Sequence, residues 1–211
     1  MTRTLYYAPG SCALAPHILL EEVGDPYQAT LVSTDAGQTR SEPFHRLNSK
    51  ARVPVLTEAD WILTEAAAIS LHIATSSPSA MLMPDGAHGL VKAIEWTNWL
   101  ATVHATAVRM IWRPLEFVSA DTMAADVVAR GHNHLATAFQ LIERRLEASE
   151  WAVGTRYSYV DATILVFYRW GNRMHLDMRT TYPHWTRHTE RLLTRPAVQR
   201  ALEAEGISVW A

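Results

Sequence analysis

The sequence predicts a small α/β domain followed by an all-helical domain. Three observations support this fold class. Short β-type and helical runs alternate over the first third of the chain. A stretch rich in proline and glycine follows at residues 77–89, and beyond it apolar residues recur only at helical spacing. We therefore expect a first domain at residues 1–80, a linker at 81–89 and a helical domain at 90–211.

The first domain contains strand-like runs separated by turn residues. A helix is expected at 13–23, with Pro16 in its first turn and Gly24 closing it. A second helix is expected at 65–76. The predicted strands are Thr4–Tyr7, Tyr27–Ser33 and a hairpin of Val53–Leu56 with Trp61–Thr64. This β-α-β, β-β-α order is typical of a thioredoxin-like domain.

The second domain shows no convincing strand. Apolar periodicity predicts an all-α bundle with helices at 90–112, 121–146, 161–173, 183–193 and 197–204. The pair Ser158 and Asp161 has capping-box spacing, which predicts a structural helix start.

Composition excludes several classes of partner. The 211 residues carry a net charge of -2 without a long single-sign run, which argues against nucleic acid or an anionic membrane. A single cysteine cannot form an intrachain disulfide and fits a reducing compartment. No signal-like or spanning apolar segment is visible. We expect a cytoplasmic protein that binds neither nucleic acid nor membrane.

Cys12 is the cysteine in question, and it follows the turn pair Pro9-Gly10 where a strand meets a helix. Helix N-termini stabilise negative charge, so a thiol placed there tends to have a lowered pKa and to be reactive. The alternative is a small, inert, buried side chain, which is common for a lone cysteine.

Six segments, taken in order, resemble the glutathione S-transferases, and most closely their bacterial beta class. The resemblance spans essentially the whole chain. The segments are Leu5–His17 around Cys12, Asn48–Leu56 with Val53-Pro54, Leu63–Ile69, Ile94–Thr102, Ser158-x-x-Asp161 and Arg195–Val198.

The resemblance implies a homodimer with glutathione as co-substrate, a small apolar electrophile as second substrate, and a role in detoxification. It implies three groups of site residues. Cys12, Ser11 and His104 would be catalytic; Val53, Pro54, Glu65, Ala66, Asn98 and Thr39 would bind glutathione; Tyr7, Trp112 and Trp170 would line the electrophile pocket. A cis Val53-Pro54 bond would turn the Val53 N–H and C=O outward to pair with the tripeptide. Glu65 would meet its α-ammonium group.

Two departures from the family pattern concern the chemistry. Ala66 replaces the usual serine and so removes a hydroxyl. The family's His-Lys pair falls on Ala105-Thr106, and His104 stands one residue earlier, about 100° around a helix. His104 can take that role only if the helix bends or shifts register.

No metal is expected, since His184 and His188 lie four apart but lack a third ligand. Three functions remain open. The first is transfer of glutathione to an apolar electrophile, and the second is thiol–disulfide reduction through Cys12. The third is a non-catalytic binding protein with the same fold.

Overall fold

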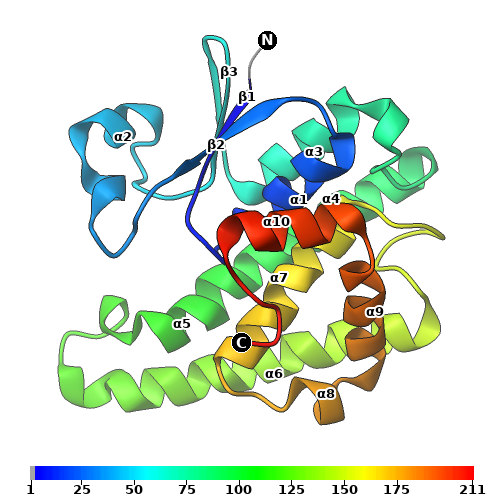
Figure 1. Cartoon of the computed structure of the whole chain (residues 1–211). Helices are drawn as coiled ribbons and strands as arrows, with labels where there is room; N and C mark the ends of the chain where they lie inside the picture. The colour runs from blue at the N-terminus through cyan, green and yellow to red at the C-terminus, as the bar shows by residue number, and fades with distance from the viewer. Residues whose placement is uncertain (1–2) are drawn as a thin grey trace.

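The computed structural model describes residues 3–211, in which a four-stranded mixed sheet with its helices packs against a larger helical part (Figure 1). The sheet order is β2-β1-β3-β4, with β2 parallel to β1 and the other two pairs antiparallel. The strands are β1 (Arg3–Tyr7), β2 (Tyr27–Leu31), β3 (Val55–Glu58) and β4 (Trp61–Thr64). The thioredoxin-like prediction is confirmed.

The bounds of β1, β2 and β3 differ from the prediction. Strand β1 begins at Arg3, one residue before the predicted Thr4. Strand β2 ends at Leu31 instead of Ser33. Strand β3 begins at Val55 rather than Val53, because Pro54 has no N–H to donate to the sheet. The hairpin turn then narrows to Ala59 and Asp60, with Ala59 at a positive φ of 51°.

Three helices accompany the sheet. Helix α1 (Leu14–Val23) has Pro16 in its first turn and ends at Gly24, whose φ is 76°. The polar stretch after β2 forms a 3₁₀ turn at Gln38–Arg40 and helix α2 (Glu42–Leu47). Helix α3 is Ala66–Ser76.

The rest of the described chain is helical. Helix α4 begins at Gly86, four residues before the predicted start, and the long predicted helix is interrupted by a π-helical segment at His104–Val108. The helices are α4 (Gly86–Val103), α5 (Arg109–Trp112), α6 (Ala124–Ala148), α7 (Tyr159–Arg173), α8 (Met178–Thr181), α9 (Pro183–Leu193) and α10 (Pro196–Glu205), with 3₁₀ turns at Pro78–Ala80, Pro114–Glu116 and Asp121–Met123.

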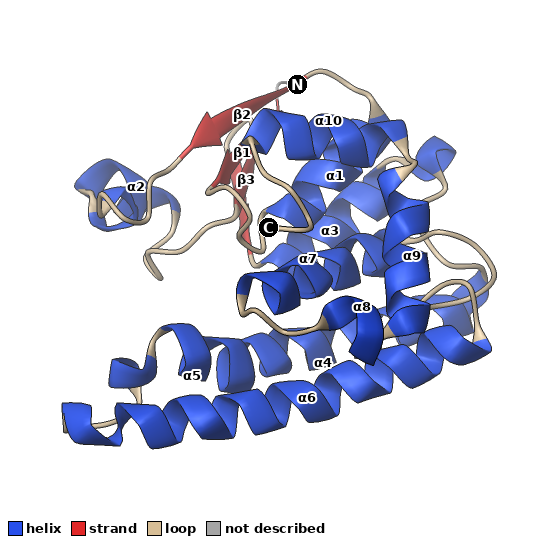
Figure 2. Cartoon of the chain, turned by 60° about the horizontal axis from the view of Figure 1, so that its bottom comes forward, coloured by secondary structure: helices blue, strands red, loops and turns tan. Residues whose placement is uncertain are grey.

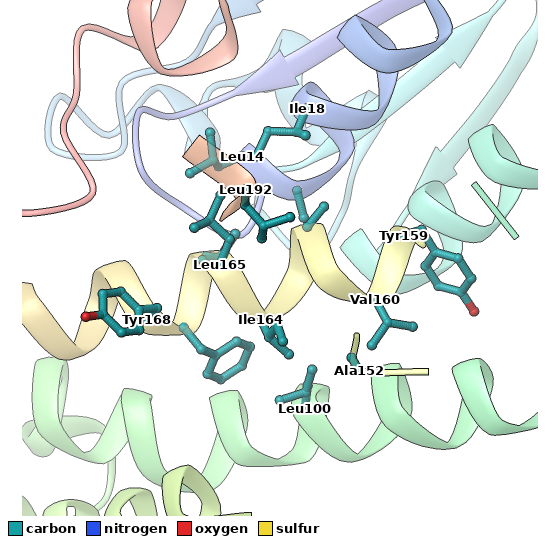
Figure 3. Packing of buried hydrophobic residues seen from close by; sticks show 14 of the residues in the cluster. Leu14, Ile18, Leu100, Ala152, Tyr159, Val160, Ile164, Leu165, Tyr168 and Leu192 are labelled. Carbon is teal, nitrogen blue, oxygen red and sulfur yellow. The ribbon is translucent and has the colours of Figure 1, made fainter. Parts of the chain in front are cut away.

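Helix α7 is the centre of one core shared by both parts. Leu165 faces Leu14 of α1 and Leu192 of α9, whereas Ile164 on its other side faces Leu100 of α4 (Figure 3). Helix α10 also packs along α1 beside the sheet (Figure 2). The loop between β1 and α1 is therefore held from the helical side.

The capping box at the start of α7 is confirmed. The Asp161 carboxylate accepts hydrogen bonds from the Ser158 N–H (2.8 Å) and hydroxyl (3.0 Å), from Ala152 N–H (2.9 Å) and from His188 Nε2 (2.8 Å). This hydrogen bond to Asp161 thus holds the His188 side chain in the buried core. Over residues 3–211, no helix has both the length and the apolar character needed to cross a bilayer.

Candidate active site

Cys12 lies in a tight turn that links β1 to α1. The Ser11 N–H donates to the Ala8 carbonyl (3.1 Å), and the Ser11 hydroxyl accepts from Ala13 N–H (3.2 Å). The hydroxyl keeps its own proton to donate to a ligand. Helix α1 starts at Leu14, so both Ser11 and Cys12 lie just ahead of its N-terminus.

Gly10 ties this turn to the helical part. Its N–H donates to the Glu205 carboxylate (2.7 Å), and its carbonyl accepts from the Trp170 indole (2.9 Å). Gly10 has a φ of +66°, and a Cβ there would lie 2.3 Å from the Arg169 guanidinium. Glu205 also binds His17 Nδ1 (2.8 Å), and both side chains are fully buried. Only glycine fits this position.

The Cys12 thiol is protonated, which corrects the expectation of a lowered pKa. Its Sγ donates to the Val53 carbonyl at 3.6 Å. Burial raises the pKa of Cys12 to about 11, and Glu65 raises it further; the backbone N–H of Cys12 and the charge of Arg52 oppose this incompletely. A hydrogen bond to a carbonyl requires the thiol form. Loss of solvation outweighs the helix N-terminus here.

Cys12 alkylation provides a direct check. Because the folded pKa is about 11, the rate with iodoacetamide should keep rising up to about pH 11. At pH 7.5 it should be at least about tenfold slower than for a free cysteine thiol. The urea-unfolded chain is the control, since Cys12 is its single cysteine. A folded-state plateau below pH 8 would contradict the assignment.

The turn before β3 lies against the Cys12 turn. Its Val53-Pro54 peptide bond is cis, as predicted. The Asn48 amide donates to the Arg52 carbonyl (2.6 Å), which fixes the approach to this turn. The Val53 carbonyl was expected to be free for a ligand. It instead accepts a hydrogen bond from the Cys12 thiol. A ligand that pairs with this carbonyl must displace the thiol.

Glu65 directly precedes α3, whose first residue is Ala66. Its φ and ψ of 74° and 121° are unusual for a residue with a side chain, and such backbone strain clusters at binding sites. Its carboxylate accepts from the Lys50 ammonium at 2.5 Å, and Lys50 also donates to Thr64 (2.8 Å). An ammonium group therefore already occupies the partner position expected for glutathione.

Thr39 and Asn98 are placed differently from each other. Thr39 is 7% exposed within the 3₁₀ turn at Gln38–Arg40. Asn98 is exposed on α4. Within the described part of the chain, no side-chain hydrogen bond joins either residue to the Cys12 turn, so their binding roles stay predictions.

His104 is the first residue of the π-helical segment, and its own N–H still donates to the Leu100 and Ala101 carbonyls, so it keeps the register of α4. The Arg109 N–H donates to the His104 carbonyl five residues earlier. This wider turn shifts the register of the residues that follow His104 by about 100°. It does not supply the shift that a histidine one residue early requires. The His104 ring packs on Trp170, with centroids 5.2 Å apart.

His104 is a neutral imidazole at physiological pH. Burial lowers its pKa to about 4, and the charges of Arg109 and Arg52 lower it further, opposed by Glu65. Arg52 and Glu65 belong to the sheet-bearing part, whereas His104 belongs to the helical part. His104 therefore lies within electrostatic range of residues that flank the Cys12 turn, and the N–H of its neutral ring can donate a hydrogen bond to an anion.

The predicted pocket residues differ in exposure. Trp112 is 39% exposed and packs edge-on against Trp170 at 5.4 Å. Trp170 is 2% exposed and Tyr7 9%, with the Tyr7 ring tilted against His17 at 5.1 Å. Trp112 is thus the exposed member, and the pocket role of all three residues stays a prediction.

Sequence reasoning missed Arg52, Lys50 and Glu205 as site residues. Arg52 acts on the pKa of Cys12, His104 and Arg109. A cationic residue directly before the Val53-Pro54 pair was the available signal for Arg52. Nothing local indicated Glu205, because its partner Gly10 lies 195 residues away in the sequence.

Two family models match the chain. One is described as glutathione S-transferase, N-terminal domain, and matches residues 1–75. The other is described as glutathione S-transferase, C-terminal domain, and matches residues 100–196.

Individual relatives agree with these matches. The chain is 33% identical to glutathione S-transferase GstA of Escherichia coli, over 96% of this chain and 98% of that protein. It is 31% identical to a glutathione S-transferase of Xanthomonas campestris, over 97% and 99%.

Solved structures include a Sulfitobacter glutathione transferase homologue with bound glutathione (25% identity, TM-score 0.90, 98% of this chain and 99% of that one). A beta-class glutathione S-transferase of Sphingomonas chungbukensis shares 32% identity with a TM-score of 0.81, over 97% and 100%.

Proposed function

The chain belongs to the glutathione S-transferase family, and we propose that it conjugates glutathione to small apolar electrophiles at the Cys12 turn. Family membership makes the chain a glutathione transferase; the substrate type and the residue roles are the proposal. The observation that supports this proposal is that four elements of the predicted site lie close together. The Cys12 turn, the Val53-Pro54 turn, the Glu65 helix start and His104 surround one region.

Glutathione is proposed to bind across these elements. Its α-ammonium group replaces Lys50 at the Glu65 carboxylate, and its α-carboxylate accepts from the free N–H groups at the start of α3, beginning with Ala66. Its cysteinyl backbone pairs with Val53, displacing the Cys12 thiol. Thr39 and Asn98 are proposed to contact the outer part of the bound glutathione.

The thiol chemistry follows from the protonation states. The thiol proton passes to solvent, and the N–H of the neutral His104 imidazole, the protonated Cys12 and Ser11 donate hydrogen bonds to the resulting thiolate. The thiolate attacks the electrophilic carbon beside Trp112. A carbon–sulfur bond forms, and the leaving group departs with the electron pair of its broken bond.

Disulfide reduction through Cys12 is the less favoured function. That reaction needs a Cys12 thiolate as nucleophile, and burial holds this thiol protonated at neutral pH. A non-catalytic role is opposed by the full-length similarity to the glutathione S-transferases of Escherichia coli and Xanthomonas campestris.

We further propose a cytoplasmic homodimer with a role in detoxification. An apolar groove of about 220 Å³ between α4 and α6, lined by Glu95, Trp96, Trp99 and Leu141, supports self-association. Val91 on the same α4 helix is 64% exposed. Analytical ultracentrifugation measures the oligomeric state.

The direct test is glutathione binding together with conjugation of 1-chloro-2,4-dinitrobenzene. We expect saturable binding of glutathione and turnover above the uncatalysed rate. The absence of binding at millimolar glutathione would overturn the proposal. Binding without turnover of several electrophiles would support the non-catalytic alternative.

The Glu65→Gln variant tests the ammonium contact. Loss of a charged hydrogen-bond partner should raise the KM for glutathione about tenfold. The kcat should change much less, because Glu65 does not touch the reacting sulfur. Glu203→Gln on the exposed face of α10 is the matched control. Equal KM values for glutathione in the wild type, Glu65→Gln and Glu203→Gln would exclude this role of Glu65.

A further inference from the structure

Arg169, on helix α7, is a buried cation that the proposed chemistry does not use. It is 5% exposed. Within residues 3–211, both of its side-chain hydrogen bonds go to main-chain carbonyls: Nε donates to Ser208 (2.9 Å) and Nη1 donates to Gly10 (3.4 Å). Burying a charge is costly unless hydrogen bonds compensate it, and an apolar side chain would avoid that cost. We call this connection from Ser208 through Arg169 to Gly10 the Arg169 bridge.

One end of the Arg169 bridge belongs to the Cys12 turn. The Arg169 guanidinium lies so close to Gly10 that it leaves no space for a Cβ there. The Gly10 carbonyl also accepts a hydrogen bond from the Trp170 indole (2.9 Å). Ser11 and Cys12 follow Gly10 directly in the chain. A displacement of Gly10 therefore moves the two donors that are proposed to meet the glutathione sulfur.

The other end of the Arg169 bridge belongs to the C-terminal segment, residues 207–211, which runs from α10 back onto α7 (Figure 1). Two contacts anchor this segment. Asn172 on α7 donates to the Val209 carbonyl (2.9 Å), and the Arg179 guanidinium on α8 lies 4.1 Å from the centroid of the Trp210 ring. The carbonyl at this end of the bridge is thus held in place by its neighbours.

We propose that Arg169 is a positioning residue: through the Arg169 bridge, the seating of the C-terminal segment sets where Ser11 and Cys12 stand for hydrogen bonding to the glutathione sulfur. This inference rests on the proposed function, which places that sulfur at the Cys12 turn. The guanidinium is a rigid planar group, so its Nε and Nη1 donors cannot move independently. A shift of the Ser208 carbonyl is therefore passed to the Gly10 carbonyl. Misplacement of a reacting group by about 1 Å can cost about 100-fold in rate.

The Arg169→Lys variant tests the bridge, because lysine keeps the charge but has a single nitrogen in place of the planar fork. The Gly10 carbonyl keeps its Trp170 partner and Ser208 is exposed, so neither carbonyl is left buried without a partner. At a pH below the pKa of the bound thiol, kcat with 1-chloro-2,4-dinitrobenzene should fall about tenfold. The KM for glutathione should change by about twofold at most, because the contacts to its backbone and ammonium group are unaltered.

The ultraviolet absorbance of the bound glutathione thiolate, followed against pH, is a readout that loss of stability alone would not move. The midpoint of this titration should rise by about one pH unit in Arg169→Lys, which is the tenfold loss of thiolate that lowers kcat. Arg144→Lys, exposed on α6, is the matched control and should keep the wild-type midpoint. An unchanged midpoint in a folded Arg169→Lys protein would overturn the inference.

The Trp210→Ala variant tests the C-terminal end of the bridge, and it decides the question if Arg169→Lys does not fold. Trp210 is 38% exposed, and its loss frees the C-terminal segment from Arg179. The midpoint should rise in Trp210→Ala, by less than in Arg169→Lys. Trp210→Ala should add no further shift to Arg169→Lys, because the link is then already broken. No shift in Trp210→Ala, or additive shifts in the double variant, would overturn the inference.

Failure of the proposed function gives a different result. If the wild-type protein neither binds glutathione at millimolar concentration nor conjugates 1-chloro-2,4-dinitrobenzene, the proposed function fails. If the wild type does both, and Arg169→Lys and Trp210→Ala share its titration midpoint, only the positioning role of Arg169 fails.

Discussion

Replacing His104 with alanine should lower kcat/KM for conjugation by about 100-fold, the usual scale for loss of one hydrogen-bond donor to the reacting anion. The KM for glutathione should change little, because His104 is proposed to touch only the sulfur. Since burial lowers the pKa of His104 to about 4, the imidazole remains neutral from pH 8 down to about pH 5. The wild-type rate should therefore show no loss near pH 6.5 from protonation of this residue.

Two measurements separate this role from a structural one. Imidazole signals followed by NMR should give His104 a pKa near 4. His134→Ala, exposed on α6, is the matched control for activity. His104→Ala also removes a ring contact with Trp170, so its melting temperature must be compared with wild type. Wild-type kcat/KM in a well-folded His104→Ala protein would exclude the assignment.

Replacing Glu205 with alanine should cost about 3 kcal/mol of unfolding free energy, because it leaves buried partners unpaired. The lost contacts are those to the Gly10 N–H (2.7 Å) and to His17 Nδ1 (2.8 Å). Both connect α10 to the sheet-bearing part. The same change should loosen the Cys12 turn and speed alkylation of its thiol.

Urea denaturation measures this loss, with alkylation followed under native conditions. Glu205→Gln retains an acceptor for the Gly10 N–H and should cost less than the alanine variant. Glu203→Ala, two residues away and exposed, should lie within about 0.5 kcal/mol of wild type. A loss below 0.5 kcal/mol in Glu205→Ala would show that the network contributes little.

Much of the fold could be predicted because its signals are local. Gly24 ends α1, Pro183 begins α9, and the Ser158–Asp161 spacing marks the start of α7. Each acts through backbone geometry or capping within a few residues. The turns that contain Cys12 and Pro54 could be predicted from the sequence for the same reason.

The electrostatic state of the site could not be predicted in this way. Apolar periodicity did not reveal the π-helical segment that begins at His104. The helix N-terminus suggested a reactive Cys12, but burial raises its pKa instead. The charge of Arg52 lowers the pKa of Arg109 and of His104 only once the two parts of the chain pack together.

A crystal structure of the complex with glutathione would show whether the ligand fills the Cys12 turn. We expect the glutathione sulfur within hydrogen-bond distance of Cys12 and His104, with Glu65 released from Lys50 and bound to the α-ammonium group. Glutathione bound elsewhere on the chain, or a Cys12 turn that remains empty at millimolar glutathione, would contradict it.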